Sequence, residues 1–150
     1  MYSKSFTAGW ADMDFNSHMR NTAFLDRAAD VRMMFFSEHG FPMSEFIRLK
    51  VGPVIMRDDI EYFREIGLLD PFAVTLALAG LASDGSRFLM RNVTLRGDGK
   101  PCAKVTSAGG WLDLEARRLV APPTQLLAAL QSLPRTEDFV ELTSSLRSGA

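Results

Sequence analysis

Residues 10–36 read WADMDFNSHMRNTAFLDRAADVRMMFF and join a short polar loop to a long apolar segment. The apolar side chains of this segment recur at the helical spacing i, i+4, i+7 and i+11: Phe24, Ala28, Val31 and Phe35. Asn21 is a residue type that begins helices, whereas Gly40 followed by Pro42 is a stop signal. We therefore expect one helix over about residues 22–39, with the polar loop at the positive end of its dipole.

The loop before this helix is dense in polar side chains. Within ten residues it carries two carboxylates, one imidazole and two carboxamides: Asp12, Asp14, Asn16, His18 and Asn21. Free N–H groups in the first turn of a helix can receive an oxyanion, and a carboxylate just upstream can attack or deprotonate a group held there. The loop is therefore a candidate acyl-transfer site. The alternative is that Asp14 and Asn21 only cap the helix and His18 packs in a tight loop, and the chemistry of the residues leaves both open.

A longer pattern connects the loop to a known family. The pattern is Asp14-x-x-x-His18-Met19-x-Asn21-x-x-Phe24-Leu25, with Trp10 before it and Ala28-Ala29-x-x-Arg32 after it. It resembles the 4-hydroxybenzoyl-CoA thioesterase-like branch of the hotdog-fold superfamily, over about residues 4–130. The resemblance implies that Asp14 is the catalytic carboxylate and that a backbone N–H near Asn21 polarises the thioester carbonyl. We assign His18 to shaping the loop beside them.

Three positions depart from the family pattern. Ser17 stands where many relatives have glycine, Arg20 where asparagine is frequent, and Phe24 where tyrosine is usual. These departures concern the shape of the loop and the substrate more than the class of reaction.

The resemblance also implies a set of substrate contacts. Coenzyme A would be part of the substrate rather than a cofactor, and the strands after the helix would hold its phosphates through basic side chains. Candidates are Arg57, Arg87, Arg91 and Lys104, with Ser86 beside them in the hairpin of residues 84–87. The alternative is that each is a solvated charge at the sheet edge. For a hydrophobic acyl or aryl-acyl group we expect contacts from Phe15, Met19 and Phe24, although helix side chains also form ordinary cores.

Composition limits the other possibilities. The chain has 150 residues, 47% of them apolar, and a net charge of −1 from 17 basic and 18 acidic side chains. This predicts one domain and disfavours a nucleic-acid partner. The lone Cys102, the first ten residues and the lack of a long apolar run predict a cytoplasmic protein with no membrane segment. Two histidines 21 residues apart do not have the spacing of a zinc site, so no metal is expected.

The rest of the chain predicts an antiparallel sheet. We expect strands over residues 3–8, 51–66, 72–83, 86–96 and 101–113, an extension at 119–120, and a short helix at 125–133. In the strand at 72–83, large and small side chains alternate, and we expect the small face to receive the helix. Gly109-Gly110 predicts a bulge or a close backbone approach covered by Trp111. The domain would span residues 1–133 and be followed by a fraying tail, 134–150.

Together these features predict an α+β hotdog fold, in which a curved antiparallel sheet wraps one long central helix. The favoured function is an acyl-CoA thioesterase with Asp14 as general base or nucleophile. Two alternatives share the fold: a non-catalytic module that binds acyl-CoA or acyl-carrier protein, and a hydratase or dehydratase. Because long apolar strands exceed what one helix can cover, and because the family builds its site between subunits, we also expect a homodimer or tetramer.

Overall fold

The structure, a computed structural model, describes residues 1–146. Its elements in chain order are β1 (Tyr2–Thr7), the 3-10 turn η1 (Trp10–Asp12), α1 (Asn21–Glu38), α2 (Met43–Leu49), β2 (Val51–Tyr62), β3 (Pro71–Ala82), β4 (Arg87–Arg96), β5 (Pro101–Asp113), β6 (Arg118–Val120), α3 (Thr124–Ser132) and β7 (Arg135–Leu142). Among these residues no helix has the length and apolar character needed to cross a membrane.

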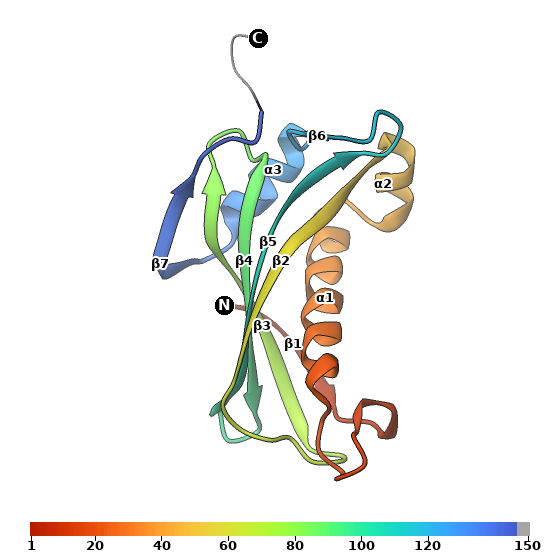
Figure 1. Cartoon of the computed structure of the whole chain (residues 1–150), viewed down its shortest axis with the longest axis vertical. Coiled ribbons are helices and arrows are strands. Elements are labelled where there is room, and N and C mark those ends of the chain that lie inside the picture. The colour runs from red at the N-terminus through yellow and green to blue at the C-terminus, as the bar shows by residue number, and fades with distance from the viewer. Residues whose placement is uncertain (147–150) are drawn as a thin grey trace.

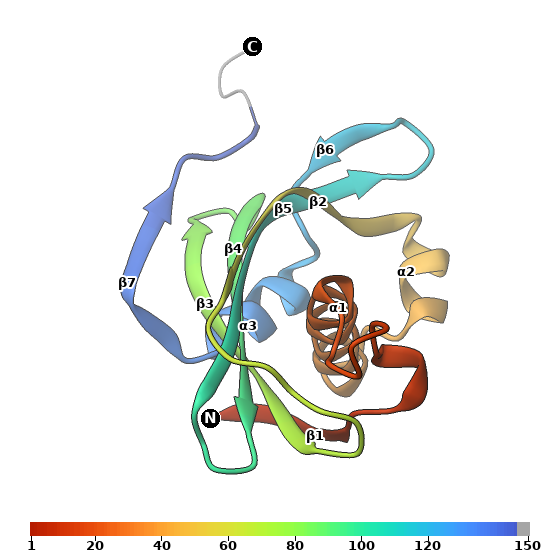
Figure 2. The ribbon, with the colours of Figure 1, turned by 60° about the horizontal axis from the view of Figure 1, so that its bottom comes forward.

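One sheet contains all seven strands. Its main path runs β1-β3-β4-β5-β2, with β6 paired to β5 and β7 paired to β3. All pairs are antiparallel except β3 with β7. The sheet curves around α1, which lies in its hollow, while β7 lies on the far side (Figures 1 and 2). This is the predicted hotdog arrangement, a curved sheet around one long helix.

The face of α1 predicted to be apolar forms the centre of the core. Val31 and Phe35 are buried and belong to one cluster with Val74 and Leu76 of β3. The helix therefore packs on the large side chains of β3, and the expectation that the small side chains would receive it is wrong. The reason is that the core needs apolar volume under a helix of this length, whereas a row of alanines would leave a gap.

Gly109 and Gly110 of β5 allow a close approach of backbone and ring. A Cβ on Gly109 would lie 2.2 Å from the carbonyl oxygen of Val54 and 2.8 Å from the ring of Phe88. The predicted close approach is confirmed, and the bulge lies opposite it in β2, where the register shifts between Ile55 and Arg57.

The C-terminal segment is a strand where the sequence predicted a fraying tail. Residues Arg135–Leu142 form β7 parallel to the second half of β3. Arg91 of β4 holds the strand in place through a bidentate ion pair with Asp138, in which Nη1 donates to Oδ1 at 2.7 Å and Nη2 donates to Oδ2 at 3.1 Å. The tail prediction is therefore wrong for this segment, and residues 147–150 lie outside the described part of the chain.

Candidate active site

The loop before α1 is folded around the carboxylate of Asp14. Oδ1 of Asp14 accepts hydrogen bonds from the backbone N–H groups of Asn16, at 2.9 Å, and His18, at 3.2 Å. The backbone N–H of Asp14 in turn donates to the carbonyl oxygen of His18 at 2.8 Å. Asp14 is exposed, and Oδ2 has no hydrogen-bond partner among residues 1–146. One oxygen thus holds the loop, and the other is left without a protein partner on an exposed residue.

Ser17 occupies the left-handed region at the tip of this turn, with φ of 62°. Non-glycine residues pay a steric cost in this region, whereas glycine does not. This gives a physical reason for the glycine that many relatives carry at the position. Ser17 therefore adopts this turn at some cost in stability.

His18 connects the loop to the segment between β2 and β3. Its Nε2 lies 3.1 Å from Oε2 of Glu65, and its backbone forms an isolated bridge with Gly67. The next residue, Met19, donates its N–H to the carbonyl oxygen of Ile66 at 2.8 Å. These contacts support the assignment of His18 to shaping the loop.

The first turn of α1 begins directly after the loop and is not capped by a side chain. Its N-cap is Arg20, which makes no side-chain cap, so the alternative in which Asp14 or Asn21 caps the helix does not describe this structure. The side chain of Arg20 instead bonds to Ala11 O, Thr22 Oγ1 and Asp26 Oδ2. The backbone N–H groups of Asn21 and Thr22 have no acceptor among the described residues. They are free donors at the positive end of a helix dipole.

Asp12 differs from Asp14 in that all its contacts are structural. It is 8% exposed, accepts the Gly9 N–H at 2.9 Å, and receives Nη2 of Arg27 at 3.1 and 3.2 Å. Burial alone would raise the pKa of Asp12, but the Gly9 N–H and the Arg27 guanidinium outweigh it and leave the pKa below its ordinary value. The pair fixes the loop on α1. Sequence reasoning missed Arg27, although its polar side chain on a helix opposite a carboxylate-rich loop was a usable signal.

The three predicted acyl contacts have different environments. Phe15 is 98% exposed at the tip of the loop, whereas Met19 and Phe24 are 5% and 3% exposed and belong to the core. The ring of Phe24 packs edge-on against Tyr62, whose hydroxyl donates to the carbonyl oxygen of Asn21 at 3.0 Å. Within one chain, only Phe15 offers its surface to a ligand. Met19 and Phe24 support the loop and the start of α1 from the core side.

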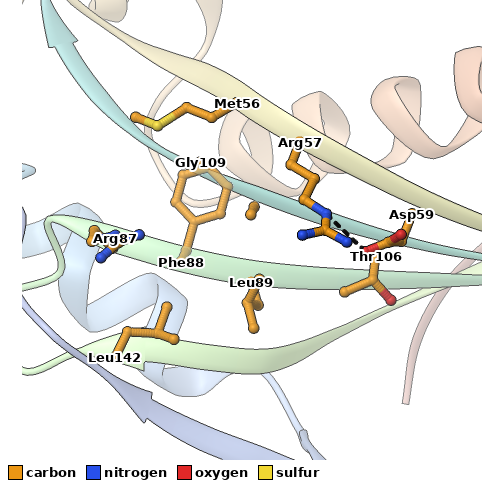
Figure 3. A pocket seen from close by; sticks show the side chains of 10 residues that line it. Met56, Arg57, Asp59, Arg87, Phe88, Leu89, Thr106, Gly109 and Leu142 are labelled. Carbon is orange, nitrogen blue, oxygen red and sulfur yellow. Dashed lines mark ion pairs between the residues drawn. The ribbon is translucent and has the colours of Figure 1, made fainter.

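Two of the predicted arginines line one pocket on the outer face of the sheet (Figure 3). The pocket has a volume of about 420 Å³ and includes Arg57 of β2, Arg87 of β4 and Thr106 of β5. Arg57 pairs with Asp59 at 3.2 Å, the ion pair drawn in the figure. Buried neighbours such as Phe88 alternate with Arg87 along β4, so the arginine side chains leave the sheet on the side away from α1. Asp14 and this pocket therefore do not form one cleft within a chain.

The remaining predicted binding residues are engaged in the fold. Ser86 is fully buried, and its Oγ lies 3.2 Å from Ser144 Oγ and accepts the N–H of Ser145 at 3.0 Å. Arg91 is held by Asp138 and donates from Nε to Thr106 Oγ1 at 3.0 Å. Lys104 pairs with Glu61 at 3.2 Å. Of the predicted set, Arg57 and Arg87 are the two that share a pocket.

Within residues 1–146, no three or more His, Cys, Asp or Glu side chains are grouped so that they could hold a metal ion. Cys102 is buried, and burial raises the pKa of its thiol, which opposes a role as a thiolate nucleophile. Among the described residues, the loop before α1 offers an exposed carboxylate, Asp14, and the first turn of α1 offers free backbone N–H groups.

Residues 8–130 match the model of the thioesterase-like superfamily. A comparison with curated protein sequences finds no match.

Solved structures similar to this chain share its fold. One is the protein SAV2348 from Staphylococcus aureus in complex with CoA, with a TM-score of 0.79 and 23% identity over 89% of this chain and 85% of that one. A second is Slr0204, a 1,4-dihydroxy-2-naphthoyl-CoA thioesterase from Synechocystis, with a TM-score of 0.79 and 15% identity over 88% and 96%. A third is the gentisyl-coenzyme A thioesterase BH1999, with a TM-score of 0.75 and 17% identity over 85% and 98%. At these identities the likeness establishes the fold alone.

Proposed function

The chain belongs to the thioesterase-like superfamily, and from this premise we propose that it hydrolyses acyl-CoA thioesters with Asp14 as the catalytic carboxylate. The observation that carries the proposal is the contrast between the two aspartates of the loop. Asp12 is buried and fully bonded, whereas Asp14 presents a free oxygen at the loop that leads into the uncapped start of α1. A carboxylate kept free while its own loop is held rigid is suited to chemistry rather than to folding.

Two routes are open to Asp14. As a general base, it takes a proton from water while the water oxygen bonds to the thioester carbonyl carbon, and the C–S bond of the tetrahedral intermediate then breaks. As a nucleophile, Oδ2 bonds to the carbonyl carbon, the CoA thiolate leaves, and water hydrolyses the resulting anhydride. In both routes the products are a carboxylic acid and free CoA, and the thiolate takes up a proton.

Either route places negative charge on the carbonyl oxygen of the intermediate. The N–H groups of Asn21 and Thr22 are without acceptors in the described structure and lie at the positive end of α1. We assign them to the oxyanion. Their contribution is large because fixed backbone donors need no reorganisation during the reaction, and the loss of one such donor typically costs about 10²–10³-fold in rate. His18 acts through the loop, which it anchors to Glu65.

The proposed substrate is a hydrophobic acyl- or aryl-CoA, and the proposed assembly is a homodimer or a tetramer. The arginine pocket of Arg57 and Arg87 suits the phosphates of CoA, but it lies across the sheet from α1. A single CoA cannot pass through the sheet. We therefore assign the arginines facing a given Asp14 to a second copy of the chain. A cytoplasmic location remains a prediction from composition.

A panel of acetyl-, hexanoyl-, decanoyl- and benzoyl-CoA with a thiol-reactive dye tests the proposal. We expect release of free CoA, with kcat/KM rising from acetyl- to decanoyl-CoA because each buried methylene adds up to about 0.8 kcal/mol. Binding of the thioesters without release of thiol would indicate the non-catalytic module instead. A rate highest for acetyl-CoA would contradict the hydrophobic substrate.

A further inference from the structure

A small cavity between α1 and the sheet has an arginine in its wall. Its volume is about 150 Å³, and its lining is apolar except for Arg32: α1 contributes Ala29, Met33 and Phe36, and β2 contributes Pro53 and Ile55. A cavity of this size is large enough to bind benzene in another protein. It shares Phe88 with the arginine pocket, but Asp14, Asn21 and Thr22 do not line it.

Arg32 is buried, and only part of its hydrogen-bonding capacity is used. The residue is 6% exposed, and Nη1 donates to Asn92 Oδ1 at 3.2 Å and to Ser107 Oγ at 2.9 Å. Among residues 1–146, Nε and Nη2 have no acceptor. Neither atom is fully shut off from solvent, because the buried side-chain atoms without a partner among the described residues are Arg27 Nε, Thr136 Oγ1 and Ser145 Oγ. An apolar group that filled the cavity would displace the water at these donors and leave them unpaired, which costs free energy.

The charge of Arg32 is balanced without a direct ion pair. Ser107 donates its hydroxyl to Asp58 Oδ1 at 2.5 Å, so the carboxylate of Asp58 is linked to the guanidinium through one hydroxyl. Burial lowers the pKa of Arg32, and the charge of Asp58 opposes this effect. Asn92 cannot rotate to offer more, because its Nδ2 donates to the carbonyl oxygen of Thr75 at 2.9 Å. An occupant of the cavity would therefore satisfy the free donors with a neutral acceptor atom, since Asp58 already supplies a negative charge nearby.

An apolar stripe leads from the proposed catalytic site to this cavity. Leu25, Ala29 and Met33 are half-buried and spaced i, i+4 and i+8 on α1, so they lie on one face of the helix. The rise along the helix from Asn21 to Ala29 is about 12 Å. A saturated chain of about ten carbons covers this length, since bonds of about 1.5 Å advance by less than their length in a zigzag.

We propose that this cavity receives the far end of the acyl chain and that Arg32 recognises a neutral oxygen there, so that the substrate is a medium-chain acyl-CoA with a hydroxyl or keto group at or near its end. This inference rests on the proposed function, because it places the thioester at the start of α1. It narrows the hydrophobic acyl group to one that ends in a hydrogen-bond acceptor. A plain alkyl chain fills the cavity but leaves Nε and Nη2 unsatisfied, so it binds less tightly.

Binding of thioether analogues, which cannot be hydrolysed, tests the inference separately from catalysis. We would measure Kd by calorimetry for S-decyl-CoA and S-(10-hydroxydecyl)-CoA. Wild type should bind the hydroxylated analogue about tenfold tighter, the usual effect of a hydrogen bond to a charged donor. In Arg32→Met, which keeps an apolar side chain of similar length, the two analogues should bind equally. Loss of thioesterase activity with this binding pattern intact would refute the proposed function and leave the cavity assignment standing.

Two further variants test the inference even if Arg32→Met does not fold. Ala29→Leu fills the cavity without touching the arginine, so it should weaken both decyl analogues about tenfold and leave S-butyl-CoA unchanged. Ser37→Leu adds the same side chain at an exposed position of α1 and should change nothing. Equal Kd values for the two decyl analogues in wild type, or tighter binding of the analogue with a terminal carboxylate, would overturn the inference.

Discussion

Replacing Asp12 by asparagine should destabilise the fold without removing Asp14, the carboxylate that we propose to be catalytic. The side chain of Asp12 is 11% exposed and that of Arg27 is 28% exposed, so their ion pair is largely shielded from water. Asparagine keeps one oxygen for the Gly9 N–H but turns a neutral amide toward the guanidinium. Loss of a hydrogen bond between charged groups costs about 1.5–3 kcal/mol. For a chain of 150 residues, about 2 kcal/mol corresponds to a decrease in Tm of about 4–8 °C.

Thermal unfolding followed by circular dichroism at one protein concentration measures this effect. Asp26→Asn is the matched control, because Asp26 pairs with Arg20 at 3.1 Å but is 63% exposed. An exposed pair contributes less than about 1 kcal/mol, so this variant should unfold close to wild type. Equal Tm values for the two variants would refute the structural role of Asp12.

The pH dependence of the same difference provides a second check. The pKa of Asp12 is lower in the folded state than its ordinary value of 3.8. A depressed carboxyl pKa stabilises the fold fully above the ordinary value, and this contribution is lost as pH falls through the folded value. The gap in Tm between wild type and Asp12→Asn should therefore be constant down to about pH 5 and shrink below pH 3.8. A gap that widens in acid would contradict the assignment.

Three further predictions concern the loop, the assembly and the arginine pocket. Ser17→Gly should retain kcat and full stability, because φ of 62° suits glycine. Ser17→Val should lower both Tm and kcat, since a β-branched residue is strained there. Equal Tm and kcat values for the two variants would show that the turn is not required. Light scattering at micromolar concentration should give at least a homodimer, and a monomer would contradict the shared site. Arg57→Ala and Arg87→Ala should each raise KM for acyl-CoA about tenfold with little change in kcat. Arg48→Ala on α2 serves as the control. An unchanged KM in the two pocket variants would exclude the pocket from CoA binding.

Local sequence patterns were sufficient to predict most of the elements. The helix expected at residues 22–39 is α1, Asn21–Glu38, and the strand expected at 101–113 is β5, Pro101–Asp113. Both are long segments with a strong period, and such segments depend little on distant contacts. The resemblance in the loop located Asp14 and the start of α1 together, because both lie within a few residues of sequence.

The features that sequence analysis missed depend on contacts between distant segments. The strand β7 pairs with β3 across more than fifty residues, and its own pattern, RTEDFVEL, has little apolar alternation. The cluster of Arg32, Asn92 and Ser107 draws one residue from each of three elements. No period or motif in a single sequence predicts such a cluster. The face of β3 that receives α1 was likewise decided by the volume of the core rather than by the strand's own pattern.

The measurement that tests the central claim most directly is the turnover of Asp14→Asn on decanoyl-CoA, followed by release of free CoA. The carbonyl oxygen of asparagine can still accept the N–H groups of Asn16 and His18, so the loop and the Tm should be preserved. Because the amide can neither take a proton from water nor attack the thioester, kcat should fall about 10²–10⁴-fold. A folded Asp14→Asn variant with turnover near that of wild type would contradict the assignment of this carboxylate as the catalytic group.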